Sequence, residues 1–448
     1  ITFNPTVPAS GTIRATVSGI FDETGLVTVT VGILHPLTVR DAAAGGGNAV
    51  TNHTMTTDQS YMMYAAGYDA DNNYRQDESA NWTLNGSLDG SGSSGTTSYT
   101  FNPSIAPTSG SIVAVVGSIS DVPGTITVNT GALHHLTVRD AAGGGGAEVT
   151  TRSLTTDQAL TVYAAGYDAE NNYRQDENAT WTSTLGLSGS GTSITFNPTV
   201  PASGTIRATA SSIFDETGLI TVTAGALHHL IIRNAAGGGG TEITTYSMTT
   251  DDSLRLYTAG YDADNNFLAD QSAVWTLTGT LDGSGTTGTT FTFRPHISGT
   301  SGLIAATVGT LSDYTGNITV SIGTLHQIRI NTSAIAGAAE FTDQTLTTDQ
   351  TVSLYSAGYD ADNNWRSLVS STWSSTGTLD PVSASGTSIV FDPVTAPASG
   401  RIIAVSAALR DTTGTINVIT GSISTIRIRT AAGGGGVELG ASTLTADD

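Results

Sequence analysis

One short phrase returns four times along the chain and constrains its fold more than any other feature. It reads GYDADNNY, GYDAENNY, GYDADNNF and GYDADNNW. The copies begin at Gly67, Gly166, Gly260 and Gly358, which places them 99, 94 and 98 residues apart. A regular period of this kind indicates one structural unit made several times over. A tryptophan follows each copy, at Trp82, Trp181, Trp275 and Trp373.

Two further markers keep the same period of about 97 residues, which is the size of one immunoglobulin-type sandwich. An aromatic-x-Pro marker begins at Phe3, Phe101, Phe196, Phe293 and Phe391. A Thr-x-Asp marker ends at Asp58, Asp157, Asp251, Asp349 and Asp447. Together the markers predict the C-terminal part of one repeat, four complete repeats and the N-terminal part of another, at 1–32, 33–131, 132–225, 226–323, 324–421 and 422–448.

The repeat at 132–225 reads as short strands separated by turn residues. HLTVRDA and EVTTRSL flank a run of four glycines (143–146), which we expect to carry strand A from one sheet to the other because glycine adopts positive φ cheaply. ALTVYAAGYDA and ATWTSTL read as strands B and C, and SITFNP, GTIRATASSI and GLITVTAG follow, the last two split by FDETG. About seven such strands predict an all-β, Greek-key immunoglobulin-like sandwich. The short joints predict an extended rod of such sandwiches.

We expect the tryptophan of strand C to fill the centre of each sandwich core. The chain contains no cysteine, so no disulfide can pack against the indole ring. Aliphatic side chains such as Leu160, Val162 and Ile206 are therefore expected to close the pocket around it. Burial of such a large apolar side chain is a major stabilising contribution to a domain of this size.

Composition narrows the classes of function. The net charge is −22 and every basic residue is an arginine, which argues against binding to nucleic acid or anionic lipid because both require cationic patches. No apolar run of about 20 residues occurs, so we expect no membrane insertion in this segment. The chain has neither a cysteine nucleophile nor an HExxH motif, and its acidic loops are nearly identical copies. We therefore expect no enzyme.

The repeated acidic loop is the best candidate for chemistry. Counting its first aspartate as position 1, oxygen-bearing side chains recur at positions 1, 3, 5 and 9, except that position 9 is Leu368 in the fourth repeat. Hard oxygen ligands at alternating positions suit Ca²⁺, which is the one cofactor that the sequence suggests. The pattern is not an EF-hand, because flanking helices are not expected. The candidate ligands are Asp69, Asp71, Asn73, Asp77, Asp168, Glu170, Asn172, Asp176, Asp262, Asp264, Asn266, Asp270, Asp360, Asp362 and Asn364.

Two interpretations of this loop stay open. In an immunoglobulin sandwich the B–C and F–G loops share one end, so acidic residues in both loops would form an interdomain calcium site resembling that of cadherins. The alternative is a turn rich in Asp and Asn, whose side chains cap their own backbone. The expected F–G acids are Asp22, Glu23, Asp121, Asp215, Glu216, Asp313 and Asp411.

Aromatic and histidine residues provide weaker signals. An aromatic side chain follows each acidic loop, where it could stack on a sugar or cap its own core. Adjacent histidines occur at 134–135 and 228–229, and paired histidines can bind metal. The equivalent positions are His326-Gln327 and Ser424-Thr425 in later joints, which favours a linker role. The aromatic positions are Tyr74, Tyr173, Phe267 and Trp365.

The two incomplete repeats do not add up to a whole one. Residues 1–32 match the last strands of a repeat and residues 422–448 match the first. Joined, they would still lack strands B and C with the acidic loop and the tryptophan. We therefore expect a window of a longer repetitive polypeptide, with strand exchange between chains as the alternative.

The phrase YAAGYDADNN, followed within nine residues by Trp82, resembles bacterial immunoglobulin-like repeats of the Big and invasin type. The resemblance covers the whole chain and implies a secreted, rod-forming scaffold at the cell surface. Three functions fit it: a structural fibre, stalk or sheath that associates with other copies of itself, the stalk of an adhesin, and a glycan-binding array that uses the aromatic loops.

Overall fold

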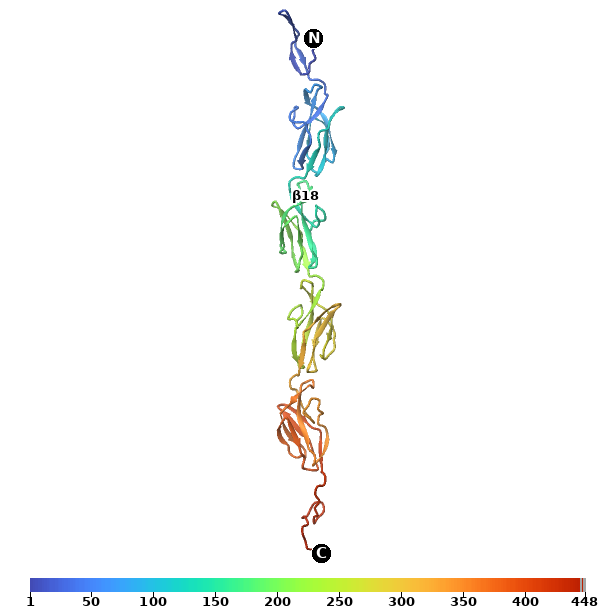
Figure 1. The fold of residues 1–448 in the computed structure, drawn as a ribbon, viewed down its shortest axis with the longest axis vertical. Helices are drawn as coiled ribbons and strands as arrows, with labels where there is room; N and C mark the ends of the chain where they lie inside the picture. Colours follow the sequence, from blue (N-terminus) through green and yellow to red (C-terminus); the bar gives the residue numbers. More distant parts are fainter. Residues whose placement is uncertain (444, 446–448) are drawn as a thin grey trace. The chain divides into compact units, whose positions relative to one another are not determined.

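A computed structural model describes residues 1–443 and 445, and its regular secondary structure consists of β-strands (Figure 1). The last Thr-x-Asp marker, Asp447, lies outside the described residues. The chain divides into two compact units, Ile1–Gly225 and Ala226–Asp448, which are considered separately. Among the described residues, no helix has the length and apolar character needed to cross a membrane.

The repeat at 132–225 contains eleven strands rather than the expected seven, because short strands that the pattern did not separate are distinct in the structure. They are β15 (His135–Arg139), β16 (Arg152–Thr155), β17 (Leu160–Tyr167), β18 (Tyr173–Asp176), β19 (Ala179–Ser183), β20 (Ser188–Gly191), β21 (Ser193–Phe196), β22 (Ala202–Gly204), β23 (Ile206–Ala210), β24 (Ile213–Glu216) and β25 (Ile220–Thr223). The same order recurs in strands β5 to β14 (37–129), β26 to β36 (229–321) and β37 to β47 (327–419).

These strands form two packed layers. The first layer has the order β15-β17-β18, and β21 also pairs with β17. The second contains β20-β19-β23-β24 and β16-β25-β22. In the repeat at 33–131 one strand, β12 (Thr108–Val116), takes the places of β22 and β23, so this layer is a single sheet there. Two β layers around one core confirm the predicted all-β immunoglobulin-like sandwich.

The glycine run does carry the chain between layers, as predicted. Strand β15 pairs antiparallel with β17 in the first layer, and β16 pairs in parallel with β25 in the second. Gly143, Gly144 and Gly146 have φ values of +69°, +69° and +64°. Such values favour glycine, which explains the composition of this crossing.

The tryptophan lies at the centre of each core. The indole of Trp181 is fully buried and packs in one cluster with Leu160, Val162 and Ile206, the side chains expected to close its pocket. Its Nε1 donates a hydrogen bond of 2.9 Å to the carbonyl oxygen of Gly191. Because that bond satisfies the polar end of the ring, the remaining apolar surface is buried without an unpaired group. Equivalent clusters surround Trp82, Trp275 and Trp373.

Two local assignments made from the sequence were wrong. The acidic loop is not the crossover between strands B and C; it is the turn of a hairpin between β17 and β18 within the first layer. The crossing to the second layer follows β18. The expected F–G loop acids are also not in a loop, because Asp215 and Glu216 belong to β24 and their equivalents to the matching strands. Alternation of apolar and polar residues cannot detect strands of three or four residues that begin within a turn sequence.

The aspartate of β24 closes one edge of the sandwich. Asp215 accepts a hydrogen bond of 2.6 Å from the backbone amide of Val138 on the edge strand β15. The same bond, also 2.6 Å, occurs at Asp121, Asp313 and Asp411. A paired amide on an edge strand is no longer available to another chain, so this side chain blunts the edge. At Asp313, burial raises the pKa despite the hydrogen bond from the amide of Ile232.

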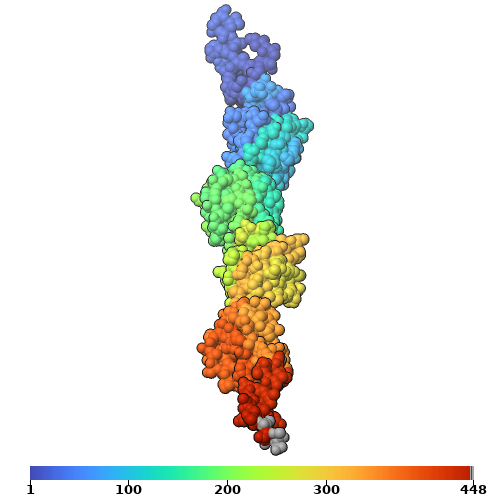
Figure 2. Space-filling view, turned by 60° about the horizontal axis from the view of Figure 1, so that its bottom comes forward, coloured from blue at the N-terminus to red at the C-terminus, as the bar shows by residue number. Residues whose placement is uncertain are grey.

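Residues 1–32 form part of a sandwich only. Their strands are β1 (Ala9–Gly11), β2 (Arg14–Val17), β3 (Ile20–Glu23) and β4 (Val27–Val29), in two sheets of two strands. Ile13 is 38% exposed, whereas its equivalent in the complete repeat, Ile206, is fully buried. Figure 2 shows this segment in dark blue as thin and open, because only part of the two-layer arrangement is present around it.

We predict that Trp82→Ala lowers the free energy of unfolding of its own repeat by about 3–5 kcal/mol, because it leaves a large cavity in a closed core. Native-state hydrogen exchange should show residues 33–131 opening first. The control is Thr83→Ala at the exposed neighbouring position, which should change little. A loss below about 1 kcal/mol would mean that the indole is not a core element.

Candidate functional site

The acidic loop folds around the carboxylate of its first aspartate. In the second complete repeat, Asp168 Oδ1 accepts hydrogen bonds from the backbone amides of Glu170 (3.2 Å) and Asn172 (2.8 Å). Asn171 adopts a φ of +67°, a left-handed conformation that asparagine tolerates better than most residues. An aspartate followed three and four residues later by asparagines is therefore a local sequence signal for this tight turn.

The side-chain amide of Asn172 completes the turn. Its Nδ2 donates to both carboxylate oxygens of Asp168, at 3.1 Å and 3.0 Å. The amide nitrogen thus occupies the position between two carboxylate oxygens that a bound cation would take in a bidentate carboxylate site. The same pairing occurs between Asp69 and Asn73 and between Asp262 and Asn266.

The carboxylate of Asp168 also binds the preceding repeat. Its Oδ2 accepts a hydrogen bond of 2.8 Å from the hydroxyl of Thr57 and one of 3.0 Å from the backbone amide of Gly131. Asp168 is fully buried and Thr57 is 4% exposed. A buried ionised group is stable only when hydrogen bonds replace its hydration, and here five N–H or O–H groups do so.

Asn172 makes a second contact with that repeat. Its Nδ2 donates to the carbonyl oxygen of Ser104 (3.0 Å), and its Oδ1 accepts from the backbone amide of Ala106 (3.0 Å). A side-chain amide that binds both a carbonyl and an amide of one segment fixes its position as a neighbouring strand would. We name Asp168 and Asn172, together with Thr57 and Gly131, the interdomain latch.

The second unit contains the same latch between its two complete repeats. Asp360 Oδ2 accepts hydrogen bonds from the hydroxyl of Thr250 (2.7 Å) and the amide of Gly323 (3.2 Å). Asn364 donates to the carbonyl oxygen of His296 (3.0 Å) and accepts from the amide of Ser298 (3.1 Å). The same contact between two complete repeats thus occurs within each of the two units.

The hydrogen bonds keep the latch carboxylates ionised. For Asp168, burial is the largest influence and raises the pKa, but the donors from Asn172, Gly131 and Thr57 outweigh it, so the pKa is lowered overall. At Asp69, the hydrogen bond from the Asn73 side chain is the main cause that lowers the pKa to about 2. Both groups therefore carry a negative charge at neutral pH.

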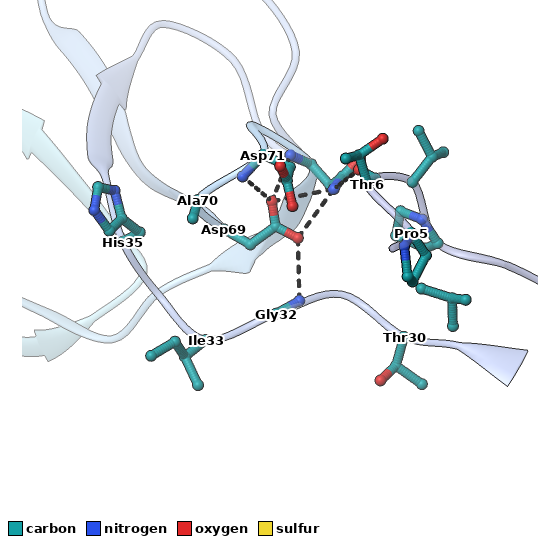
Figure 3. Close-up of a pocket in the computed structure, with 13 residues that line it drawn as sticks. Pro5, Thr6, Thr30, Gly32, Ile33, His35, Asp69, Ala70 and Asp71 are labelled. Atoms are coloured by element: carbon teal, nitrogen blue, oxygen red, sulfur yellow. Dashed lines mark hydrogen bonds between the residues drawn. The ribbon is translucent and has the colours of Figure 1, made fainter. Parts of the chain in front are cut away.

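A cleft lies beside Asp69, between residues 1–32 and the repeat at 33–131 (Figure 3). It has a volume of about 370 Å³ and is lined by residues that include Thr6, Gly32, Ile33 and Asp69. The dashed lines in Figure 3 include the bond of 3.1 Å from the Gly32 amide to Asp69 Oδ2. The equivalent oxygen of Asp168 also accepts a hydrogen bond from the Thr57 hydroxyl. The cleft is thus the position of a latch contact, seen here beside a partial repeat.

The structure does not gather the candidate calcium ligands into one cage. Positions 1 and 5 form the latch, position 3 contributes a backbone amide to it, and position 9 binds a different loop. Within the part of the chain that the structure describes, no group of three or more His, Cys, Asp or Glu side chains could hold a metal ion. Of the two interpretations, these hydrogen bonds favour the capped turn; calcium binding at Asp69, Asp168, Asp262 and Asp360 stays a prediction.

The aspartate at position 9 anchors the glycine run. Asp176 Oδ2 accepts a hydrogen bond of 2.9 Å from the amide of Gly143, and its Oδ1 accepts one of 3.1 Å from the hydroxyl of Tyr173. A Cβ at Gly144 would lie 2.6 Å from the Tyr173 ring, so the glycine backbone packs directly against the aromatic side chain. Asp77, Tyr74 and the loop at 44–45 repeat this arrangement. The aromatic residue therefore supports its own repeat.

The fourth repeat tests this assignment by changing both partners. Where the other repeats have a glycine run, it has the sequence SAIAGAA, and position 9 is Leu368 instead of aspartate. Its aromatic residue is Trp365, whose Nε1 is buried without a hydrogen-bond partner. The position-9 aspartate and the glycine run are thus both absent from this repeat, as expected if the aspartate binds the backbone of the glycine run.

Sequence reasoning missed the threonine and glycine partners in both latches. Thr57 and Thr250 occupy the middle of the Thr-x-Asp marker, and Gly131 lies at the joint. The marker was visible as a repeat, but the partner of Thr57, Asp168, lies 111 residues away along the chain. The neighbouring Asp58 also binds the joint, through the amide of Ala132 at 2.5 Å. Regular recurrence of a polar triplet at strand ends was the available signal.

Comparison with known proteins adds only distant structural likenesses. No protein-family model matches the chain, and no curated protein matches it. Solved structures with some likeness include the N-terminal four Ig domains of Dscam1 isoform 4.44, with 7% identity, a TM-score of 0.20 and coverage of 83% of this chain and 97% of that one. The protocadherin gammaB7 EC3-6 cis-dimer structure has 10% sequence identity to this chain and a TM-score of 0.34. That match covers 85% of this chain and 100% of the other.

A third such structure holds three N-terminal domains of the Highly Immunogenic Outer Capsid protein of bacteriophage RB49. Its identity is 9% and its TM-score 0.21, with coverage of 64% of this chain and 100% of that one. Likenesses this distant transfer no ligand or partner to this chain. The strand pairing and the four cores define the class of protein: a tandem array of immunoglobulin-like β-sandwich repeats.

The third repeat lacks one hydrogen bond that the first two have, and we predict that Phe267→Tyr restores it. Asp270 Oδ1 is buried without a partner there, because phenylalanine has no hydroxyl to donate. The new bond should raise the free energy of unfolding of residues 226–323 by about 0.5–1.5 kcal/mol. Tyr173→Phe should cost its repeat a similar amount. Hydrogen exchange resolved by repeat measures both changes, and destabilisation by Phe267→Tyr would refute this role of the ring.

Proposed function

We propose that this chain is a non-catalytic structural segment of an extracellular or cell-surface rod, fibre, stalk or sheath, built from immunoglobulin-like repeats like the bacterial Big and invasin-type proteins that it resembles. The observation that carries the proposal is the interdomain latch. A single-domain binding protein has no use for a buried aspartate that joins one sandwich to the preceding one.

The contacts of the latch support a mechanical role. Each latch combines a hydrogen bond between an ionised carboxylate and a threonine hydroxyl with a two-point contact from the asparagine amide. Hydrogen bonds to charged groups contribute about 1.5–3 kcal/mol when buried. Because the bonds come from different directions, they restrict bending and twisting at the joint together. The array then transmits tension or bending through successive sandwiches.

The alternatives rest on less. An adhesin stalk would use the same joints and differ only in a binding region beyond these repeats. A glycan-binding array would use Tyr74, Tyr173, Phe267 and Trp365, but in the first three repeats these rings already pack against the glycine run. A fibre or sheath requires that the chain associate with other copies of itself, so the proposed partner is a second copy of the same chain.

The absence of cysteine gives a direct test of the latch. Spin labels at Thr83→Cys and Thr182→Cys, both exposed positions in adjacent repeats, report the distance between those repeats by pulsed electron resonance. We expect one narrow distance distribution in the full chain. Asn172→Ala and, separately, Thr57→Val should broaden it, because each removes latch bonds while leaving the cores intact.

Glu170→Gln is the matched control, since only its backbone amide enters the latch, and it should leave the distribution narrow. The melting curve of each variant shows whether its repeats stay folded. A broad distribution in the unaltered chain, or no broadening in Asn172→Ala, would refute a stiff joint. Repeating the measurement with excess CaCl₂ and with EDTA separates the two interpretations of the loop: a metal-free latch gives the same width in both.

A further inference from the structure

Two adjacent histidines lie where the second unit's first repeat begins. The Nδ1 atoms of His228 and His229 are 3.5 Å apart, and their rings are nearly perpendicular, at 82°. His229 opens strand β26 (His229–Arg233) and stacks on Tyr261, with ring centroids 5.5 Å apart. The backbone amide of His228 donates to the Tyr261 carbonyl oxygen at 2.8 Å. The backbone and one ring are thus held, while His228 is exposed.

This separation matches the geometry of a chelate. Zn²⁺ binds imidazole nitrogen at about 2.0–2.1 Å, so two such nitrogens in a tetrahedral shell lie roughly 3.3–3.4 Å apart. Neighbouring side chains on a regular strand would face opposite sides, but here the first histidine precedes the strand and its ring turns back to the second. The two Nδ1 atoms face each other across a hydrogen bond of 3.5 Å, and a bridging ion would take the place of that hydrogen.

The surroundings suit a cation. The chain has a net charge of −22, which attracts cations in general. Among the described residues no third metal-ligating side chain joins the pair. An ion at this point would keep its other positions for water. Imidazole ligands select ions such as Zn²⁺, Cu²⁺ and Ni²⁺ over Ca²⁺ and Mg²⁺.

We propose that the His228–His229 pair is a chelating site for a divalent transition ion of the Zn²⁺, Cu²⁺ or Ni²⁺ type, and that the His134–His135 pair is a second copy of it. In the second copy, the rings are again edge to face, 5.9 Å apart at 86°, and His135 stacks on Tyr167 at 5.2 Å. The joint before residues 324–421 has Gln327 in place of the second histidine and provides an internal comparison.

Calorimetric titration of the full chain with CuCl₂ and with ZnCl₂ tests the site. We expect two ions per chain. The double variant His228→Asn with His229→Asn should remove one, and His134→Asn with His135→Asn the other. His326→Asn is the matched control and should leave the stoichiometry unchanged, because Gln327 cannot complete a pair.

Two further readouts separate chelation from weaker binding. In the variant that lacks His134 and His135, the electron resonance spectrum of bound Cu²⁺ should show coupling to two nitrogen nuclei, and adding His228→Asn should reduce this to one. Binding should weaken as the solution is acidified, because protons compete with the ion for the imidazole nitrogens. An unchanged stoichiometry in the double variants, or equal binding of Mg²⁺, would overturn the proposal and assign the cation to diffuse attraction by the acidic chain.

Discussion

A buried carboxylate is the constraint on which the rest of the array depends. Asp168 and Asp360 are fully removed from solvent yet ionised, so each must receive enough hydrogen bonds to replace its hydration. The turn supplies some of these donors and the preceding repeat supplies the others. Consequently the conformation of the loop and the attachment of one sandwich to the next are satisfied by the same side chain. Removal of either set leaves a charge without partners.

The acidic loop serves two parts of the repeat because its side chains point to different neighbours. Positions 1 and 5 face the preceding repeat, whereas position 9 lies on β18 and binds the glycine run of its own repeat. This division explains why position 9 changes in the fourth repeat while positions 1 and 5 do not. Position 9 follows the local glycine run, whereas positions 1 and 5 follow the contact with the preceding repeat that is seen at Asp168 and Asp360.

The asparagine amide does in this loop what a metal ion does in many interdomain joints. It contacts both oxygens of one carboxylate and a carbonyl of the neighbouring repeat. An amide also offers an acceptor oxygen, which binds the Ala106 amide and which a cation cannot provide. The two repeats are thereby joined by directional hydrogen bonds from residue types that are also typical calcium ligands. Oxygen-rich composition alone therefore does not separate a metal site from a network of hydrogen bonds.

The sequence by itself determined the repeat, the sandwich class, the central tryptophan and the glycine crossing, because each follows from local spacing or from the conformational freedom of one residue type. It placed Asp168 and Asn172 in a candidate site but left their chemistry open. Only the tertiary structure decided that Thr57, 111 residues earlier, is a partner of Asp168, and that Asp215 binds an edge strand instead of the acidic loop. Those contacts depend on how layers and repeats pack, and a hydrogen bond between distant residues leaves no mark on local periodicity.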